Sequence, residues 1–377
     1  MKRVLPILLA AALLMPCVHA APADLQLKAP SAILMEKETG TVLYENNPHE
    51  KLEPASVTKV MTMLLIMEAL DSGRIKGEDM VSVSSYAAGM GGSQVFLEEG
   101  EQMSVHEMLK CIAVSSANDA AVAMAEHLAG SESSFVEKMN DRAAQLGMSD
   151  THFSNCTGLP ISDHYTSAHD IALMSRQLIL HHPDIRTYTT IWMDSIRDGA
   201  FGLSNTNRLI RFYSGATGLK TGFTDSALYC LSATAERDGM ELIAAVMGAP
   251  TSDDRFQAAK TMLDYGFANY SLTTVHPDQA LAPVDVLVGK AAQVQPRPER
   301  QCRLLLSRDS AGQVTTQITL APNVEAPVEA GQRLGQMTVL VDGQVRDTVP
   351  LVADCSVERL ALTDIFSQLL HRLLMAG

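Results

Sequence analysis

Three short motifs carry the residues of this chain that could do chemistry. They are, in order along the chain, Ser56-Val57-Thr58-Lys59, Ser116-Ala117-Asn118 and Lys220-Thr221-Gly222. Each motif alone is common, because a serine three residues before a lysine is also a frequent start of a helix. Together they match S-x-x-K, S-x-N and K-T-G, the parts of a serine acyl-transfer site that opens amide bonds. The sequence therefore predicts a covalent serine intermediate.

The first motif supplies a nucleophile and a base. A serine hydroxyl is a weak nucleophile until a base takes its proton. Ser56 and Lys59 are three residues apart, so on a helix they share one face, and burial would lower the pKa of Lys59 toward neutrality. We expect Ser56 to attack and Lys59 to act as general base. The backbone N–H groups of Ser56 and Phe223 are expected to form an oxyanion hole.

The second and third motifs would handle the substrate. We expect Ser116 to relay a proton to the leaving amine and Asn118 to hold the substrate amide. Lys220 and Thr221, at the edge of a sheet, would bind a terminal carboxylate by charge and hydroxyl. The backbone beside Gly222 would let a peptide lie along this edge as an added strand.

The elements that must position these motifs alternate between strand and helix patterns. The pattern predicts an α+β fold in which an antiparallel sheet combines both ends of the segment around a helical middle. The expected strands span 31–35, 41–44, 218–224, 229–235 and 241–247, the last two joined by an Asp238-Gly239 turn. The expected helices span 56–70, 104–112, 120–128, 134–147, 167–180 and 253–265.

The C-terminal third has a different texture. Short alternating runs separated by Pro, Gly and Asp predict a small all-β domain over 276–358, with 295–298 as a loop. The last stretch, 360–377, repeats large apolar residues at helical spacing around a single basic residue, Arg372. We expect it to be an amphipathic helix that binds a membrane surface, although it could also pack on the β domain or on a second copy of the chain.

Composition narrows the class of protein. The chain has 377 residues, a net charge of −14 and a hydrophobic content of 46%, which fits a globular protein and argues against nucleic-acid binding. Residues 1–20 read as a signal peptide, with a transmembrane anchor as the alternative. Of the cysteines beyond it, Cys302 and Cys355 are a candidate disulfide. The absence of H-E-x-x-H and C-x-x-C from the sequence predicts no metal or cofactor.

The motifs and their surroundings resemble the serine D-alanyl-D-alanine carboxypeptidases, the low-molecular-mass penicillin-binding proteins of bacterial walls. The resemblance includes several segments besides the three motifs: Ala32–Met35, Thr39-Gly40, Pro54-Ala55, Gly91-Gly92-Ser93, Asp119-Ala120, Thr157-Gly158-Leu159, Asn205-Thr206-Asn207, Gly218-Leu219 and Phe223-Thr224. Two positions depart from it: Ala117, where a glycine is usual, and Phe223, where some members have a histidine.

The resemblance implies a transpeptidase domain of the serine β-lactamase and penicillin-binding-protein type over 24–270. It implies that Ser56 is acylated by the penultimate D-alanine of a peptidoglycan stem peptide, and that β-lactams inhibit the enzyme. Arg255 would join Lys220 and Thr221 in binding the terminal carboxylate, and residues 88–95 would form a loop over the site. The enzyme would work outside the cytoplasm, either secreted or peripherally attached to the outer face of the cytoplasmic membrane.

Three other functions share these motifs. An endopeptidase that cuts D-alanine crosslinks would use the same site chemistry. A β-lactamase shares the fold, but its second motif is usually Ser-Asp-Asn and it lacks an appended β domain. A catalytically silent β-lactam sensor would show a stoichiometric burst without turnover.

Overall fold

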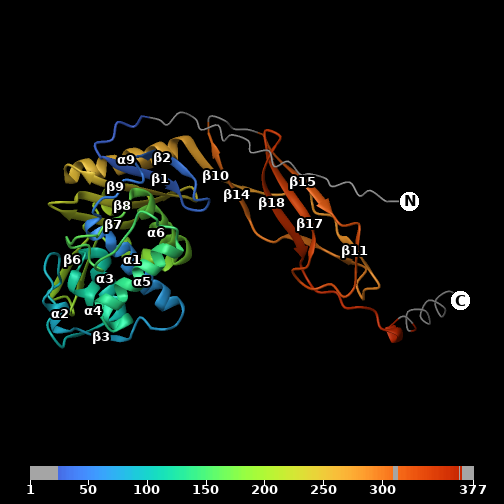
Figure 1. Ribbon diagram of the computed structural model, residues 1–377. Coiled ribbons are helices and arrows are strands. Elements are labelled where there is room, and N and C mark those ends of the chain that lie inside the picture. The colour runs from blue at the N-terminus through green and yellow to red at the C-terminus, as the bar shows by residue number, and fades with distance from the viewer. Residues whose placement is uncertain (1–23, 309–312, 365, 367–377) are drawn as a thin grey trace, which may run out of the picture.

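The computed structural model describes residues 24–308, 313–364 and 366, so the predicted signal peptide lies outside the described residues. Figure 1 shows a larger part built of a sheet with helices on both faces, and an elongated part made of strands. The two are joined through β10 (Tyr270–Val275), which follows the last helix of the larger part and pairs with β14 (Cys302–Ser307). In the described part of the chain, no helix combines the length and apolar character needed to cross a bilayer.

The sheet of the larger part has the order β2-β1-β9-β8-β7, and all its pairs are antiparallel. The first two strands join the last three through the pairing of β1 with β9, which confirms that the sheet combines both ends of the segment. Asp238 and Gly239 both have positive φ and make the tight turn predicted between β8 and β9. The strands are β1 (Ser31–Glu36), β2 (Val42–Asn46), β7 (Ala216–Thr224), β8 (Leu228–Arg237) and β9 (Met240–Ala249).

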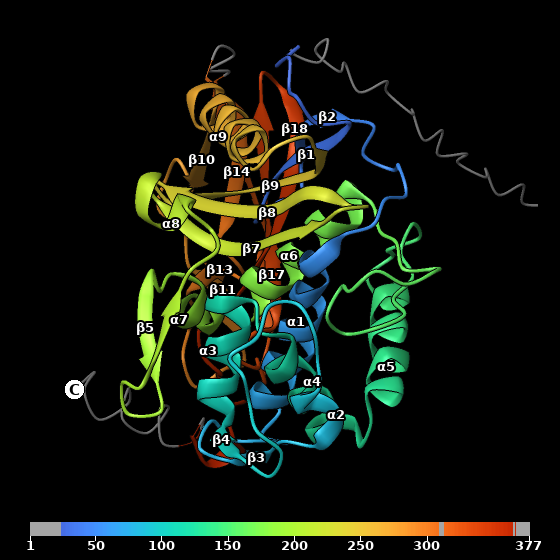
Figure 2. The same cartoon turned by 90° about the vertical axis from the view of Figure 1, so that its left-hand side faces the viewer.

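Each face of this sheet is covered by its own apolar core. Successive residues of a strand point to opposite faces, so Ile33 packs with the helical layer while Leu34 packs with α9. Figure 2 shows α9 above the sheet and the other long helices below it. These helices are α1 (Lys59–Asp71), α3 (Val105–Ser115), α4 (Asn118–Ala129), α5 (Glu132–Gln145), α6 (Ala168–His181) and α9 (Ser252–Asn269).

Short elements complete the larger part. They are η1 (Ala55–Thr58), β3 (Met80–Ser82), α2 (Ser85–Ala88), β4 (Gln102–Ser104), η2 (Pro183–Ile185), α7 (Arg186–Thr189), β5 (Met193–Ile196), β6 (Phe201–Ser204) and α8 (Leu209–Phe212). Two predicted helix starts are confirmed, because the side chains of Ser104 and Ser167 cap the N-termini of α3 and α6. The predicted start of α5 at Ser134 is wrong. The Ser131 hydroxyl accepts from the Ser134 backbone N–H, which places Ser134 inside the first turn.

The C-terminal part is made of strands, as predicted, but residues 295–298 are not simply a loop. Pro296–Pro298 forms β13, which pairs with β18 at one edge of the sheet β13-β18-β17-β15. An edge strand tolerates proline because one side of its backbone needs no partner. The other strands are β11 (Val284–Leu287), β12 (Gln293–Val294), β15 (Val314–Leu320), β16 (Asn323–Glu325), β17 (Arg333–Val341) and β18 (Gln344–Ala353).

The candidate disulfide between Cys302 and Cys355 is not formed, since both residues are free thiols. Cys302 is buried on β14 with its Sγ 3.2 Å from Asp347 Oδ2, whereas Cys355 is exposed beyond the end of β18. Of the predicted terminal helix, Leu362 and Phe366 are described and strongly exposed, and residues 365 and 367–377 lie outside the described residues.

Candidate active site

The nucleophile and base of the first motif lie at the junction of η1 and α1. Ser56 sits in the 3-10 turn η1, and Lys59 is the first residue of α1. The helix was predicted to begin at Ser56, and the first turn is wound more tightly than an α-helix. Lys59 Nζ lies 3.0 Å from Ser56 Oγ, as the three-residue spacing requires.

Lys59 is fully buried and reaches two further oxygens. Its Nζ is 2.6 Å from Asn118 Oδ1 and 2.7 Å from the carbonyl of Thr157. Burial lowers the pKa of Lys59 from 10.5 to about 7, against the opposing effects of Cys156 and Asp119. A neutral amine has two N–H donors and one lone pair. With Asn118 and Thr157 accepting those two donors, the lone pair is left for the Ser56 hydroxyl.

The second motif bridges α3 and α4. Ser116 ends α3 in a left-handed conformation, and among the described residues its buried Oγ has no hydrogen-bond partner. Asn118 begins α4 and donates to the carbonyl of Gly91 at 2.7 Å, which ties it to the loop over the site. Ala117 has a φ of −57°, a value open to any residue, so the departure from glycine leaves this turn unstrained.

Two residues to which the sequence analysis gave no role hold this loop in place. The Asp119 carboxylate is buried and accepts from the backbone N–H groups of Val95 and Leu97 at 3.1 and 3.0 Å. Arg197, in the turn between β5 and β6, donates to the carbonyl of Val95. It also pairs with Glu101 at 2.7 Å, and this bond lowers the pKa of Glu101. The only signal in the sequence was the position of Asp119 directly after Ser-Ala-Asn.

Gly222 lets the third motif reach the nucleophile. A Cβ at this position would lie 2.6 Å from the carbonyl oxygen of Pro54 and 3.1 Å from the backbone nitrogen of Ser56. Any larger residue would push β7 away from η1. β7 is also the edge strand of its sheet, so its outer side has no neighbouring strand. The first motif is therefore joined to the second by the Lys59–Asn118 hydrogen bond and lies against the third at Gly222.

Basic side chains gather around β7. Lys220 is buried with its Nζ 3.0 Å from the carbonyl of Thr221, and burial together with Lys59 and Arg255 holds its pKa well below the usual value. Arg255 donates to the carbonyl of Gly222 at 2.8 Å and so also supports β7. Neighbouring cations that lower a lysine pKa create a site that favours an anion.

Other predicted and unpredicted residues lie beside the motifs. Thr221 Oγ1 donates to Thr206 Oγ1 at 2.6 Å, and the half-exposed Phe223 ring stacks on Tyr229. The role of Thr157 as an acceptor for Lys59 had no signal beyond membership of the Thr-Gly-Leu segment. His164, whose Nε2 is 2.8 Å from Thr58 Oγ1, lies outside every segment singled out in the sequence.

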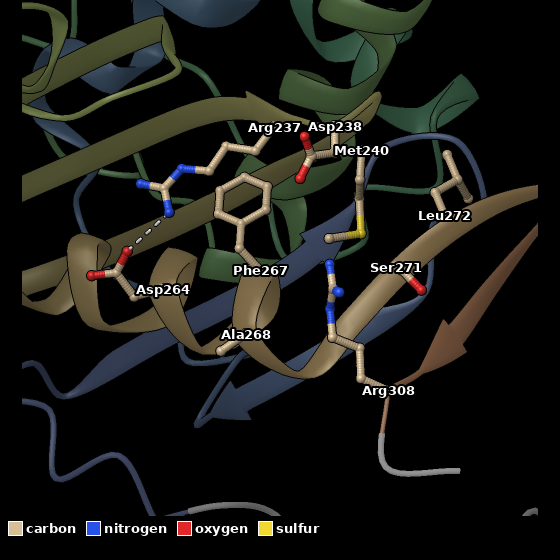
Figure 3. A pocket seen from close by; sticks show the side chains of 9 residues that line it. All are labelled: Arg237, Asp238, Met240, Asp264, Phe267, Ala268, Ser271, Leu272 and Arg308. Carbon is tan, nitrogen blue, oxygen red and sulfur yellow. Dashed lines mark hydrogen bonds and ion pairs between the residues drawn. The ribbon is translucent and has the colours of Figure 1, made fainter. Parts of the chain in front are cut away.

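Away from the motifs, a pocket of about 350 Å³ lies where α9 leads into β10 (Figure 3). Arg237 lines it, pairs with Asp264 at 3.4 Å and stacks on Phe267. No residue of the three motifs lines this pocket, so it is distinct from the candidate site. Among the described residues, no three His, Cys, Asp or Glu side chains gather closely enough to hold a metal ion.

Comparison with known proteins matches both parts of the chain to known families. Residues 18–251 match the D-alanyl-D-alanine carboxypeptidase family, and residues 270–359 match the C-terminal domain of penicillin-binding protein 5. D-alanyl-D-alanine carboxypeptidase DacF of Bacillus subtilis is 45% identical over 88% of this chain and 86% of its own length.

Solved structures agree as well. Penicillin-binding protein 5 of Haemophilus influenzae superposes with a TM-score of 0.74 and 29% identity, covering 90% of this chain and 100% of that one. Penicillin-binding protein D2 of Listeria monocytogenes, in its ampicillin-bound form, superposes with a TM-score of 0.57 and 33% identity over 65% of this chain and 99% of its own. The motifs, the fold and these matches together show that the chain belongs to the D-alanyl-D-alanine carboxypeptidase family.

Proposed function

We propose that this chain removes the terminal D-alanine from peptidoglycan pentapeptide stems through an acyl-enzyme on Ser56. The observation that carries the proposal is the fully buried Lys59, with a pKa of about 7 and its Nζ 3.0 Å from Ser56 Oγ. The named function of its relatives supports the same reaction. The ampicillin-bound Listeria protein supports inhibition of this chain by β-lactams.

Acylation starts when Ser56 Oγ attacks the carbonyl carbon of the penultimate D-alanine and its proton passes to Lys59. The carbonyl oxygen becomes an oxyanion, which we assign to the N–H groups of Ser56 and Phe223. Collapse of the tetrahedral intermediate breaks the C–N bond. The leaving D-alanine nitrogen takes the proton from Lys59 by way of Ser116, so Lys59 is neutral again.

Deacylation repeats these steps with water. Water attacks the ester carbonyl and gives a proton to Lys59, and Ser56 Oγ recovers a proton as the C–O bond breaks. The products are free D-alanine and a peptide shortened by one residue. A buried Ser116 hydroxyl without a partner among the described residues supports the relay, because an unoccupied hydroxyl can both accept and donate.

The carboxylate of the terminal D-alanine would bind among the basic side chains around β7. We propose that Lys220 and Thr221 contact it and that Arg255 adds charge from behind the strand. Thr221 Oγ1 now donates to Thr206, a contact that the substrate would replace. A crosslink endopeptidase would instead have to accept substrates in which the D-alanine carbonyl is part of a crosslink, so that no free D-alanine carboxylate follows the cut bond.

Release of D-alanine from a diacyl-D-alanyl-D-alanine peptide should collapse when its terminal carboxylate is amidated. Loss of a charge-assisted pair costs about 3 kcal/mol, or about 100-fold in kcat/KM. Lys220→Met should lower turnover of the free acid by a similar factor and narrow the difference between acid and amide. Chromatographic measurement of released D-alanine checks this. An amide cleaved as fast as the acid would contradict the carboxylate site and favour an endopeptidase.

We further propose that the enzyme works outside the cytoplasm and that 360–377 holds it at the membrane. Leu362 and Phe366 are 85% and 69% exposed, and each large apolar side chain buried in lipid contributes roughly 1.5–3 kcal/mol. The β domain uses the chain up to Leu360, because Val357 is buried in its core and the Leu360 N–H donates to the carbonyl of Val288.

A chain ending after Leu360 should therefore stay folded and active on soluble peptide but no longer sediment with lipid vesicles. Vesicle co-sedimentation and D-alanine release measure the two properties on one preparation. As a matched control, Leu362→Asp with Phe366→Asp in the full chain should weaken sedimentation without changing activity. Truncated protein that unfolds, or full-length protein that never sediments, would show that this segment is not an anchor.

A further inference from the structure

Three hydrogen bonds, one partly buried and two buried, lead from the loop before α6 to the nucleophile turn. The backbone N–H of Ser154 donates to His164 Nδ1 at 3.0 Å, and His164 Nε2 lies 2.8 Å from Thr58 Oγ1. Thr58 Oγ1 in turn donates to the carbonyl oxygen of Ala55 at 2.8 Å. Thr58 and His164 are both buried, so water does not compete for these contacts.

The groups at the two ends of this row of hydrogen bonds fix which atom donates in each one. A backbone N–H can only donate, so His164 Nδ1 must accept from Ser154 and carry no proton. Burial, followed by the charge of His152, lowers the pKa of His164 to about 4, and the ring is therefore neutral at neutral pH. Its one proton sits on Nε2 and is donated to Thr58. The carbonyl of Ala55 can only accept, so the Thr58 hydroxyl is the donor in the hydrogen bond between them.

The last acceptor in the chain belongs to the peptide group that joins Ala55 to Ser56. A peptide group is planar, so fixing the direction of the Ala55 carbonyl also fixes the direction of the Ser56 N–H. Ala55 has a φ of +47°, an uncommon value for a residue other than glycine. Such a conformation persists only where its surroundings hold it. Gly158 packs so closely that a Cβ there would lie 1.9 Å from the Ala55 oxygen.

We propose that His164, acting through Thr58, is a positioning residue that aims the Ser56 N–H at the oxyanion. The inference rests on the proposed function, which assigns that N–H to the oxyanion hole. Donation to the Ala55 carbonyl also polarises the shared peptide group, which makes its N–H a stronger donor. The effect should therefore fall on the transition state, where negative charge develops on the oxygen, rather than on ground-state binding.

Substitutions of two kinds separate this role from packing. His164→Phe keeps an aromatic ring at this position but removes both ring nitrogens. Thr58→Val keeps the branched shape of the side chain but removes its hydroxyl. Each should lower kcat about 10- to 100-fold with little change in KM, less than the ~10²–10³ lost when an oxyanion-hole donor is removed outright. His164→Gln places an amide N–H near the position of Nε2 and should recover most of the lost activity.

The measurement is steady-state release of D-alanine from a diacyl-D-alanyl-D-alanine peptide, corrected for the folded fraction from thermal melts. The double variant Thr58→Val with His164→Phe should lose no more than one single variant, because both break the same chain. His127→Gln, an exposed histidine on α4, serves as control. If His164→Phe does not fold, Thr58→Val alone decides.

Unchanged kcat in Thr58→Val, or no recovery in His164→Gln relative to a folded His164→Phe, would overturn the proposal while the wild type still turns over substrate. Additive losses in the double variant would also overturn it. Wild-type protein that releases no D-alanine would instead overturn the proposed function, and with it this inference.

Discussion

Replacing Ser56 by alanine should lower the rate of D-alanine release by about 10⁴- to 10⁶-fold, the range expected for loss of a covalent nucleophile. No acyl-enzyme can form without Oγ, and the remaining oxyanion hole would leave only weak residual catalysis. The measurement is D-alanine release from a diacyl-D-alanyl-D-alanine peptide under saturating substrate.

The fold should survive this substitution. Ser56 Oγ contributes one hydrogen bond to Lys59, and the net loss from such a bond is about 1 kcal/mol. The melting temperature should therefore stay close to that of the wild type. Ser133→Ala, an exposed serine on α5, is the matched control and should keep full activity. Turnover within tenfold of wild type in Ser56→Ala would mean that another residue is the nucleophile.

Replacing Lys59 by alanine should lower acylation by about 10³- to 10⁴-fold, because the base that takes the Ser56 proton is gone. This variant also leaves Asn118 Oδ1 and the Thr157 carbonyl without their donor, so part of the loss could come from a distorted site. Lys59→Met keeps most of the side-chain volume, and its melting temperature separates misfolding from lost base catalysis. Acylation of folded Lys59→Met within tenfold of wild type would place the base elsewhere.

The same lysine sets the pH dependence of the wild type. Only neutral Lys59 can accept a proton, and its pKa of about 7 means that the protonated form dominates at lower pH. We expect kcat/KM for D-alanine release to fall about tenfold per unit below that pKa and to level off above it. A rate that is flat from pH 5 to pH 8 would contradict a lysine base with this pKa.

Local sequence patterns anticipated the elements that carry the motifs. The Ser-x-x-Lys spacing requires one helical face, and Lys59 Nζ does reach Ser56 Oγ. The helix caps at Ser104 and Ser167 could be predicted because a cap depends only on residues a few positions apart in the sequence. A strand pair at one end of the segment and strand patterns at the other predicted a sheet that combines both ends, which the pairing of β1 with β9 confirms.

Contacts between residues far apart in the sequence could not be predicted from such local patterns. Thr157 and His164 lie 98 and 106 residues from their partners Lys59 and Thr58, in a loop with no periodicity to analyse. The strand at Pro296–Pro298 was missed because its proline signal indicates a loop unless the neighbouring β18 is known. The disulfide prediction failed for the same reason, since a pair of cysteines in one domain says nothing about the distance between their sulfurs.

Mass spectrometry of the penicillin-treated protein tests the central claim most directly. The full-length wild type should gain the mass of one penicillin, and peptide mapping should place it on the fragment that contains Ser56. Ser56→Ala, folded by its melting curve, should gain no mass under the same conditions. An adduct mapped to another residue, or one retained in Ser56→Ala, would contradict the assignment of Ser56 as the nucleophile.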